Sequence, residues 1–236
     1  MRPSRPLHIG IVACSAEGAS LCYRTLCAQG EVLLGPHAHP EISLHSLPLA
    51  DYVACLACGD LAGVAALMLR SAHKLAASGA DFLICPDNTI HQALHLVEPH
   101  SPLPWLHIAA VVADEALRRG FTRLGLSGTR WLVDSAVYSD QLAARGIDCV
   151  RPSPAERDEM SRIIMEQLVR GDCRPDSIAV FQRVYRNMRQ AGCDAVILGC
   201  TEIPLIMNDA NSPLPTLDST RLLALAALRR ACAESS

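Results

Sequence analysis

Two stretches of the sequence repeat one plan, and this repeat limits the folds open to the chain. Gly79 and Gly192 are each followed, two residues later, by an aspartate and then by a short apolar run. Each run ends in polar side chains, and the eighth residue after each glycine is Asp87 in the first copy and Cys200 in the second. The repeat predicts two matching α/β halves in which Asp87 and Cys200 occupy equivalent positions.

A second pair of landmarks supports the duplication. Gly10 and Gly125, each inside an apolar run, lie 115 positions apart, close to the 113 positions that separate Gly79 from Gly192. We therefore expect an N-terminal α/β lobe over residues 1–112 and a C-terminal α/β lobe over residues 113–236. The last helix is expected to pack back on the first lobe.

Short apolar runs alternate with helical patterns along the whole chain. The expected strands are residues 7–13, 41–47, 81–85, 105–108, 123–129, 147–150 and 195–198. The expected helices are residues 15–29, 59–78, a segment from 88, 135–145, 156–169, 176–190 and 219–232. This alternation predicts two pseudo-symmetric lobes, each a mainly parallel sheet flanked by helices, with the active site in the cleft between them.

Composition excludes several functional classes. The 236 residues are 50% hydrophobic with a net charge of −3 and carry no basic run, which argues against a nucleic-acid partner. The apolar stretches are shorter than the roughly 18 residues that a membrane span needs, and no signal peptide is evident. Eleven cysteines in a chain of this size indicate reduced thiols. We expect a cytoplasmic protein with a small-molecule substrate and no membrane association.

Polar side chains gather where four of the expected strands end. These segments are residues 14–15, 87–89, 128–129 and 200–202. Ligands of open α/β sheets bind outside the carboxyl ends of the strands, and the backbone N–H groups that follow suit a carboxylate. The pattern favours a small anionic substrate and proton-transfer chemistry.

The remaining cysteines and histidines have simpler interpretations. Cys85 lies inside an apolar strand and is interpreted as a core side chain. Nine further cysteines are interpreted as structural: Cys14, Cys22, Cys27, Cys55, Cys58, Cys149, Cys173, Cys193 and Cys232. No second Cys-x-x-Cys accompanies residues 55–58, and His37 and His39 lack nearby ligands, so no metal site is expected. His91, four residues after Asp87, is expected either to orient Asp87 or to have a structural role.

Three motifs resemble one known family. They are Asp81-Phe82-Leu83-Ile84-Cys85-Pro86-Asp87-Asn88-Thr89-Ile90-His91, Gly128-Thr129-Arg130, and Gly199-Cys200-Thr201-Glu202-Ile203-Pro204-Leu205. They are similar to motifs of the aspartate/glutamate racemases, and the resemblance extends over nearly the whole chain. The Gly-Cys-Thr-Glu motif is the most specific of the three.

The resemblance implies a racemase that uses no cofactor and works with two acid/base groups on opposite faces of the substrate Cα. Asp87 and Cys200 would be these groups, and relatives are commonly homodimers. Further positions would bind the substrate: Ser15, Tyr52, Asn88, Thr89, Thr129, Arg170, Thr201 and Glu202. An acidic amino acid is the expected substrate.

The sequence departs from the family at two positions. The family usually has cysteine where this chain has Asp87, and some aspartate-specific relatives have arginine where this chain has Tyr52. Arg170 or Arg174 is then expected to supply the missing positive charge. Two other functions stay open: a related lyase or isomerase, such as a decarboxylase of substituted malonates that uses Cys200 on one face, or a catalytically inactive protein that binds small acids.

Overall fold

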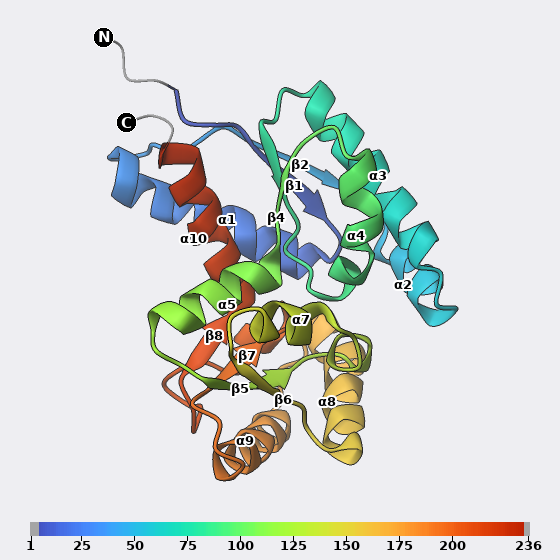
Figure 1. Ribbon diagram of the computed structural model, residues 1–236, viewed down its shortest axis with the longest axis vertical. Coiled ribbons are helices and arrows are strands. Elements are labelled where there is room, and N and C mark those ends of the chain that lie inside the picture. Colours follow the sequence, from blue (N-terminus) through green and yellow to red (C-terminus); the bar gives the residue numbers. More distant parts are fainter. Residues whose placement is uncertain (1–4, 234–236) are drawn as a thin grey trace. The chain divides into compact units, whose positions relative to one another are not determined.

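The computed structural model describes residues 5–233, which form two compact units. The first unit contains the chain up to Ile108 and the segment from Thr220 onward, and the second runs from Ala109 to Ser219. The sequence analysis divided the lobes after residue 112 and expected the last helix to pack back on the first lobe. The first unit is discontinuous, because the C-terminal helix belongs to it (Figure 1).

The first unit is built on a four-stranded parallel sheet with the strand order β2-β1-β3-β4. The strands are β1 (Ile9–Ala13), β2 (Ile42–Ser46), β3 (Phe82–Ile84) and β4 (Trp105–Leu106). Every residue of β1 and β3 is buried, which explains why both strands appear in the sequence as continuous apolar runs. The strands expected at 7–13, 41–47 and 81–85 are confirmed with shorter ends.

Helices of the first unit connect these parallel strands (Figure 1). They are α1 (Ala16–Leu34), α2 (Leu49–Ala57), α3 (Leu61–Ala77), the 3-10 helix η1 (Thr89–Ala93), α4 (Leu94–Val97), the 3-10 helix η2 (Glu98–His100) and α10 (Ser219–Ala233). The sequence analysis missed α2, which begins directly after Pro48 and is separated from α3 by a short turn. The segment expected to be helical from residue 88 is a short 3-10 turn followed by one helical turn.

The core of the first unit includes one face of its sheet. Val12, Cys14, Leu83 and Cys85 pack there with the buried side chains of α2, α3 and α4. Tyr52 of α2 is the largest fully buried side chain in this cluster.

The second unit repeats the topology of the first, with a parallel sheet in the order β6-β5-β7-β8. Its strands are β5 (Arg123–Ser127), β6 (Asp148–Val150), β7 (Ala195–Leu198) and β8 (Thr216–Asp218). The three expected strands are confirmed at β5, β6 and β7, whereas β8 was not expected. β8 has a single apolar residue, Leu217, and therefore gives no apolar run in the sequence.

The second unit contains helices that the sequence analysis did not expect. They are α5 (Ile108–Arg118), which starts at the unit boundary, α6 (Arg130–Val133), α7 (Val137–Ala143), α8 (Pro154–Glu166), the 3-10 helix η3 (Leu168–Arg170), α9 (Pro175–Gln190) and the 3-10 helix η4 (Ile203–Leu205). α5 was missed, and the helices expected at 156–169 and 176–190 are confirmed as α8 and α9.

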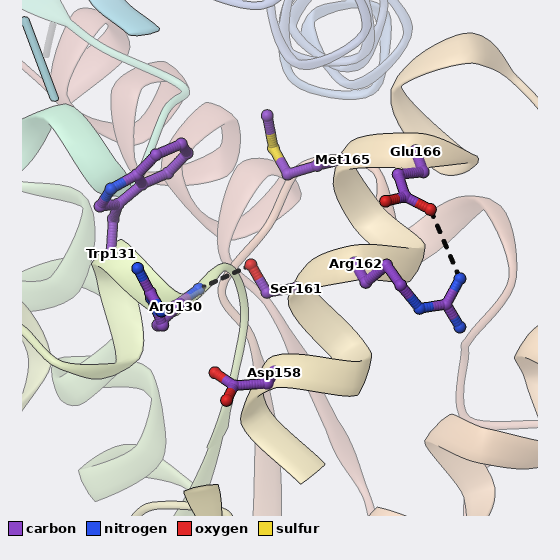
Figure 2. A pocket seen from close by; sticks show the side chains of 7 residues that line it. All are labelled: Arg130, Trp131, Asp158, Ser161, Arg162, Met165 and Glu166. Carbon is purple, nitrogen blue, oxygen red and sulfur yellow. Dashed lines mark hydrogen bonds and ion pairs between the residues drawn. The ribbon is translucent and has the colours of Figure 1, made fainter. Parts of the chain in front are cut away.

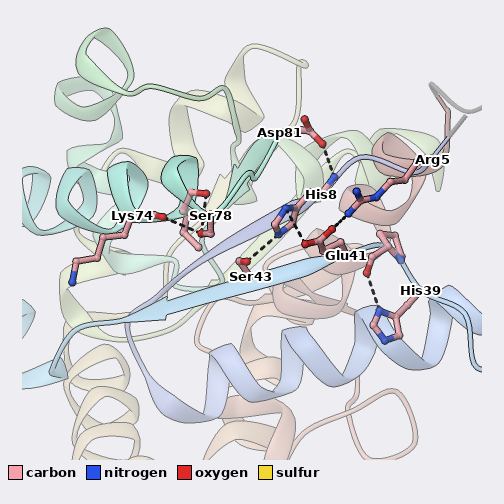
Figure 3. Close-up of polar contacts among 10 residues, drawn as sticks. Arg5, His8, His39, Glu41, Ser43, Lys74, Ser78 and Asp81 are labelled. Atoms are coloured by element: carbon pink, nitrogen blue, oxygen red, sulfur yellow. Dashed lines mark hydrogen bonds and ion pairs between the residues drawn. The ribbon is translucent and has the colours of Figure 1, made fainter.

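The same pair of hydrogen bonds forms at the start of the central strands in both units. In the first unit the Asp81 carboxylate accepts the His8 backbone N–H at 2.6 Å, and the Asp81 N–H donates to the His8 carbonyl at 2.8 Å (Figure 3). In the second unit Asp194 makes the same two contacts with Arg123, at 2.9 and 2.8 Å. The repeat read from the sequence is therefore a repeat in three dimensions.

The two glycines of the sequence repeat share a backbone conformation that favours glycine. Gly79 and Gly192 have φ angles of 88° and 85°, a left-handed region that glycine adopts without strain. Each ends the helix before β3 or β7 and turns the chain toward the aspartate. The predicted α/β fold with two mainly parallel sheets is confirmed. Among residues 5–233, no helix is long and apolar enough to cross a membrane.

Candidate active site

The strand ends of the first unit carry four of the predicted site residues. Ser15 is the N-cap of α1, where its hydroxyl accepts the Gly18 N–H at 3.2 Å. Asp87 follows β3, and its Oδ1 accepts the Ile90 N–H at 3.1 Å. Asn88 is buried beside it, and Thr89 begins η1. The carboxylate of Asp87 is thus oriented by the backbone of the turn that follows it.

His91 supports this turn. Its Nδ1–H donates to the Asp87 carbonyl at 2.7 Å, and its Nε2 accepts the Ile108 N–H at 3.3 Å. A ring with one donating and one accepting nitrogen is neutral. Burial, together with the charge of His107 when protonated, lowers the pKa of His91 to about 3. Of the two expected roles, the structural one is found, because His91 holds the backbone of Asp87.

Tyr52 lies at the base of this region, inside the core. Its side chain is fully buried, and its hydroxyl has no hydrogen-bond partner among the described residues. Burial raises the pKa of Tyr52, and the thiols of Cys85 and Cys14 and the carboxylate of Asp87 add to this effect. The hydroxyl therefore stays protonated, so it can donate a hydrogen bond.

The strand ends of the second unit carry the other predicted group. Cys200 follows β7, with 9% of its surface exposed, and its Sγ donates to Glu202 Oε2 at 2.9 Å. The Thr201 hydroxyl donates to the same oxygen, also at 2.9 Å. Thr129 caps α6 by accepting the Leu132 N–H. Glu202, predicted as a substrate-binding residue, binds the thiol and the hydroxyl beside it.

A buried tyrosine also lies in the apolar cluster around the Cys200 thiol. Tyr185 of α9 has no exposed surface, lies in the same apolar cluster as Cys200 and hydrogen-bonds to Ser127 Oγ at 2.8 Å. Burial raises the pKa of Tyr185, and the Cys200 thiol adds to the effect. The sequence analysis did not consider Tyr185, because a tyrosine in an amphipathic helix resembles any other core residue.

The two candidate arginines differ in their surroundings. Arg174 is ion-paired with Asp172 at 2.5 Å, and this pairing lowers the pKa of Asp172. Arg170 is exposed at the end of η3, and no partner of its guanidinium is found in the described part of the chain. Of the two, Arg170 is the one with an uncommitted charge.

A pocket of about 260 Å³ opens in the second unit beside α6 and α8 (Figure 2). It is lined by Arg130, Trp131, Asp158, Ser161, Arg162, Met165 and Glu166. None of these is a predicted site residue, and Arg162 is paired with Glu166 at 3.5 Å. Within residues 5–233, no three His, Cys, Asp or Glu side chains group as a metal ion requires.

The fold is similar to that of proteins described as Asp/Glu racemases or their homologues. A crystal structure of a protein assigned as an Asp/Glu racemase from Yersinia pestis has a TM-score of 0.87 and 30% identity, covering 95% of this chain and 99% of that one. An aspartate racemase homologue from Pyrococcus horikoshii OT3 has a TM-score of 0.82 at 24% identity, covering 95% and 98%. The latter similarity shows the fold alone.

Sequence comparison gives the same class. The broad specificity amino-acid racemase RacX of Bacillus subtilis (strain 168) is 25% identical over 161 residues, which are 66% of this chain and 67% of RacX. The Asp/Glu/Hydantoin racemase family model matches residues 11–227. The chain belongs to the Asp/Glu/Hydantoin racemase family. The predicted family and enzyme class, an isomerase, are confirmed.

Proposed function

We propose that the chain is a racemase or epimerase of an amino acid that transfers protons at Cα with two acid/base groups, Asp87 and Cys200. One observation carries the proposal: the Cys200 thiol donates to the buried Glu202 carboxylate at 2.9 Å, at the carboxyl end of β7. A carboxylate in that position can hold the thiol proton and leave a thiolate, which is the reactive form of cysteine.

The proposed reaction inverts one centre by two proton transfers. On one face, a base forms a bond to the α-proton as the Cα–H bond breaks, and the electron pair stays on Cα. On the other face, an acid gives its proton to that electron pair. Asp87 and Cys200 are proposed to lie on opposite faces, so each acts as the base for one enantiomer and as the acid for the other.

The negative charge that develops on the substrate needs hydrogen-bond donors held in place beforehand. We propose that four hydroxyls and one amide hold the substrate carboxylate and amino group: Ser15, Asn88, Thr89, Thr129 and Thr201. Ser15 and Thr129 are already fixed as helix N-caps. No cofactor takes part in this proposal.

The proposed substrates are the acidic amino acids, aspartate and glutamate. Arg170 is proposed to bind their distal carboxylate, because its guanidinium is exposed while Arg174 is paired with Asp172. The enzyme is further proposed to act as a homodimer in the cytoplasm.

The test is proton NMR of the purified protein in D2O with both enantiomers of aspartate, glutamate and a panel of neutral amino acids. Loss of the α-proton signal with appearance of the other enantiomer, seen by chiral chromatography, supports racemisation. Cys200→Ser and Asp87→Asn are each expected to slow it by about 100-fold or more, the usual contribution of an acid/base group. Arg170→Ala is expected to raise KM for acidic substrates alone.

The exposed Arg174 gives a matched control, since Arg174→Ala should leave both the racemisation rate and KM within about twofold of the wild-type values. If no amino acid exchanges its α-proton, the proposal is wrong, and substituted malonates become the substrates to test. Release of CO2 with a single enantiomer as product would identify the lyase instead.

A further inference from the structure

Just beyond the end of β1, a thiol occupies the position that the register of β1 and β3 matches to Asp87. β1 and β3 pair in parallel with Ile9 opposite Phe82 and Ile11 opposite Ile84. Continuing this register three residues past the last pair places Cys14 beside Asp87. The sequence analysis interpreted Cys14 as structural, because a thiol in an apolar run resembles a core residue.

By the alternation of side chains along a strand, the positions of Cys14 and Asp87 fall on the same face of the sheet. Cys14 lies two residues after Val12, and Asp87 lies two residues after Cys85. Val12, Cys14 and Cys85 all belong to the cluster on the α3 face. Alternate residues of a strand point to the same side, so Asp87 leaves β3 on the side of Cys14.

The second unit contains the same combination of groups. There a thiol, Cys200, contacts the carboxylate of Glu202 and lies near a buried tyrosine, Tyr185. The first unit brings together Cys14, the carboxylate of Asp87 and the buried Tyr52. The burial of the two thiols is similar, with 4% of Cys14 and 9% of Cys200 exposed.

Tyr52 distinguishes this arrangement from ordinary core packing. Its hydroxyl is buried without a partner among the described residues, an arrangement that is unfavourable for a polar group. The charges of Cys85, Cys14 and Asp87 all act on it. A protonated hydroxyl among these groups is a hydrogen-bond donor for a thiolate that forms beside it.

We propose that Cys14 is the group that meets the substrate α-proton on the Asp87 side, with Asp87 as its proton-holding partner and Tyr52 as the donor to its thiolate. This inference rests on the proposed function and refines which atom moves the proton. Asp87 takes the thiol proton, the Cys14 thiolate then forms an S–H bond as the Cα–H bond breaks, and the electron pair stays on Cα. The opposite direction reverses each transfer.

The first experiment compares Cys14→Ala with Cys193→Ala in the D2O exchange assay, with each enantiomer as the starting substrate. Both variants remove one sulfur from a buried apolar cluster, where 4% of Cys14 and 5% of Cys193 are exposed. Cys14→Ala is expected to slow racemisation by about 100-fold or more, and Cys193→Ala by no more than about threefold. Equal, small effects of the two would overturn the proposal and leave Asp87 as the base.

A second experiment does not depend on turnover. Iodoacetamide labelling of the wild type and of Asp87→Asn, followed by peptide mass spectrometry, measures the reactivity of each thiol at pH 7. Because Asp87 is proposed to take the Cys14 proton, Asp87→Asn is expected to slow labelling of Cys14 by about tenfold and to leave labelling of the exposed Cys58 unchanged. An unchanged rate at Cys14 would show that the two groups do not interact, which contradicts the pair.

The two experiments separate this inference from the proposed function. Racemisation by the wild type that survives Cys14→Ala overturns the inference alone. Absence of any exchange in the wild type overturns the racemase, and labelling then decides whether the Cys14 and Asp87 pair exists. Tyr52→Phe adds a third readout, because removing an unpartnered hydroxyl should leave the fold at least as stable while slowing exchange by about tenfold.

Discussion

His91 is a buried side chain that has both ring nitrogens bonded to the backbone. The hydrogen bonds to the Asp87 carbonyl and from the Ile108 N–H fix one neutral form of the ring. A single side chain thereby ties the turn that carries Asp87 to the start of α5. The position of Asp87 depends on this ring staying neutral.

The stability of the protein should therefore decrease as the pH is lowered, in a range set by the pKa of His91. Its pKa is lowered from 6.5 to about 3, so below pH 6.5 the unfolded chain binds a proton that the folded chain does not. The stabilisation that depends on a neutral His91 is complete above pH 6.5 and is lost as the pH falls toward 3. In urea unfolding between pH 6 and 5, we expect wild type to lose about 1 kcal/mol more than His91→Gln. Parallel pH curves for the two proteins would contradict the neutral, buried ring.

At the scale of elements, the end of β7 depends on a glycine. Gly199 donates its N–H to the Ser127 carbonyl at 2.9 Å, just before Cys200. A Cβ at position 199 would lie 2.7 Å from the Ser127 carbonyl oxygen, a backbone atom that cannot rotate away. The close approach of β5 and β7 at this point requires the absence of a side chain.

Gly199→Ala is therefore expected to push the end of β7 away from β5 and to move the Cys200 thiol. We expect a loss of α-proton exchange of about 100-fold, because small displacements of reacting groups are costly. Gly125→Ala on β5 is the matched control, since its nearest neighbour is the flexible side chain of Met188. Equal activity of the two variants would show that this contact does not position the thiol.

The elements also show what the sequence could reveal. The long helices and the buried strands were predicted from their patterns, and the two glycines located equivalent positions in both units. β4 was expected at residues 105–108, whereas β8 (Thr216–Asp218) has a single apolar residue and gives no apolar run. The contact of Cys200 with Glu202 depends on the turn after β7, and the approach of Cys14 to Asp87 depends on strand register. Neither is encoded in local sequence patterns.

On the scale of the whole molecule, α10 completes a unit that begins more than 200 residues earlier. The Leu7 N–H donates to the Ala231 carbonyl at 3.0 Å, and the Arg230 guanidinium lies 4.7 Å from the centre of the Phe82 ring. These contacts join α10 to β3 and to the chain entering β1. The first unit is thus closed by the C-terminal helix.

Weakening α10 should loosen the first unit before the second. Leu228 is fully buried, and Leu228→Ala is expected to cost about 2–5 kcal/mol. Hydrogen exchange followed by mass spectrometry should then show faster exchange in β1 and β3 than in β5 and β7. The exposed neighbour Arg229 provides the control, because Arg229→Ala should leave both sheets protected. Uniform loss of protection would indicate that the two units unfold together.

The discontinuous first unit also affects the order of folding during synthesis. Domains tend to fold as units while the ribosome delivers the chain from its N-terminus. Residues 109–219 emerge as one continuous segment, whereas the first 108 residues must wait for the last helix. The second half can therefore fold before the first is finished. A ribosome that stalls shortly before α10 would hold a nascent chain with a folded second half and an incomplete, protease-sensitive first half.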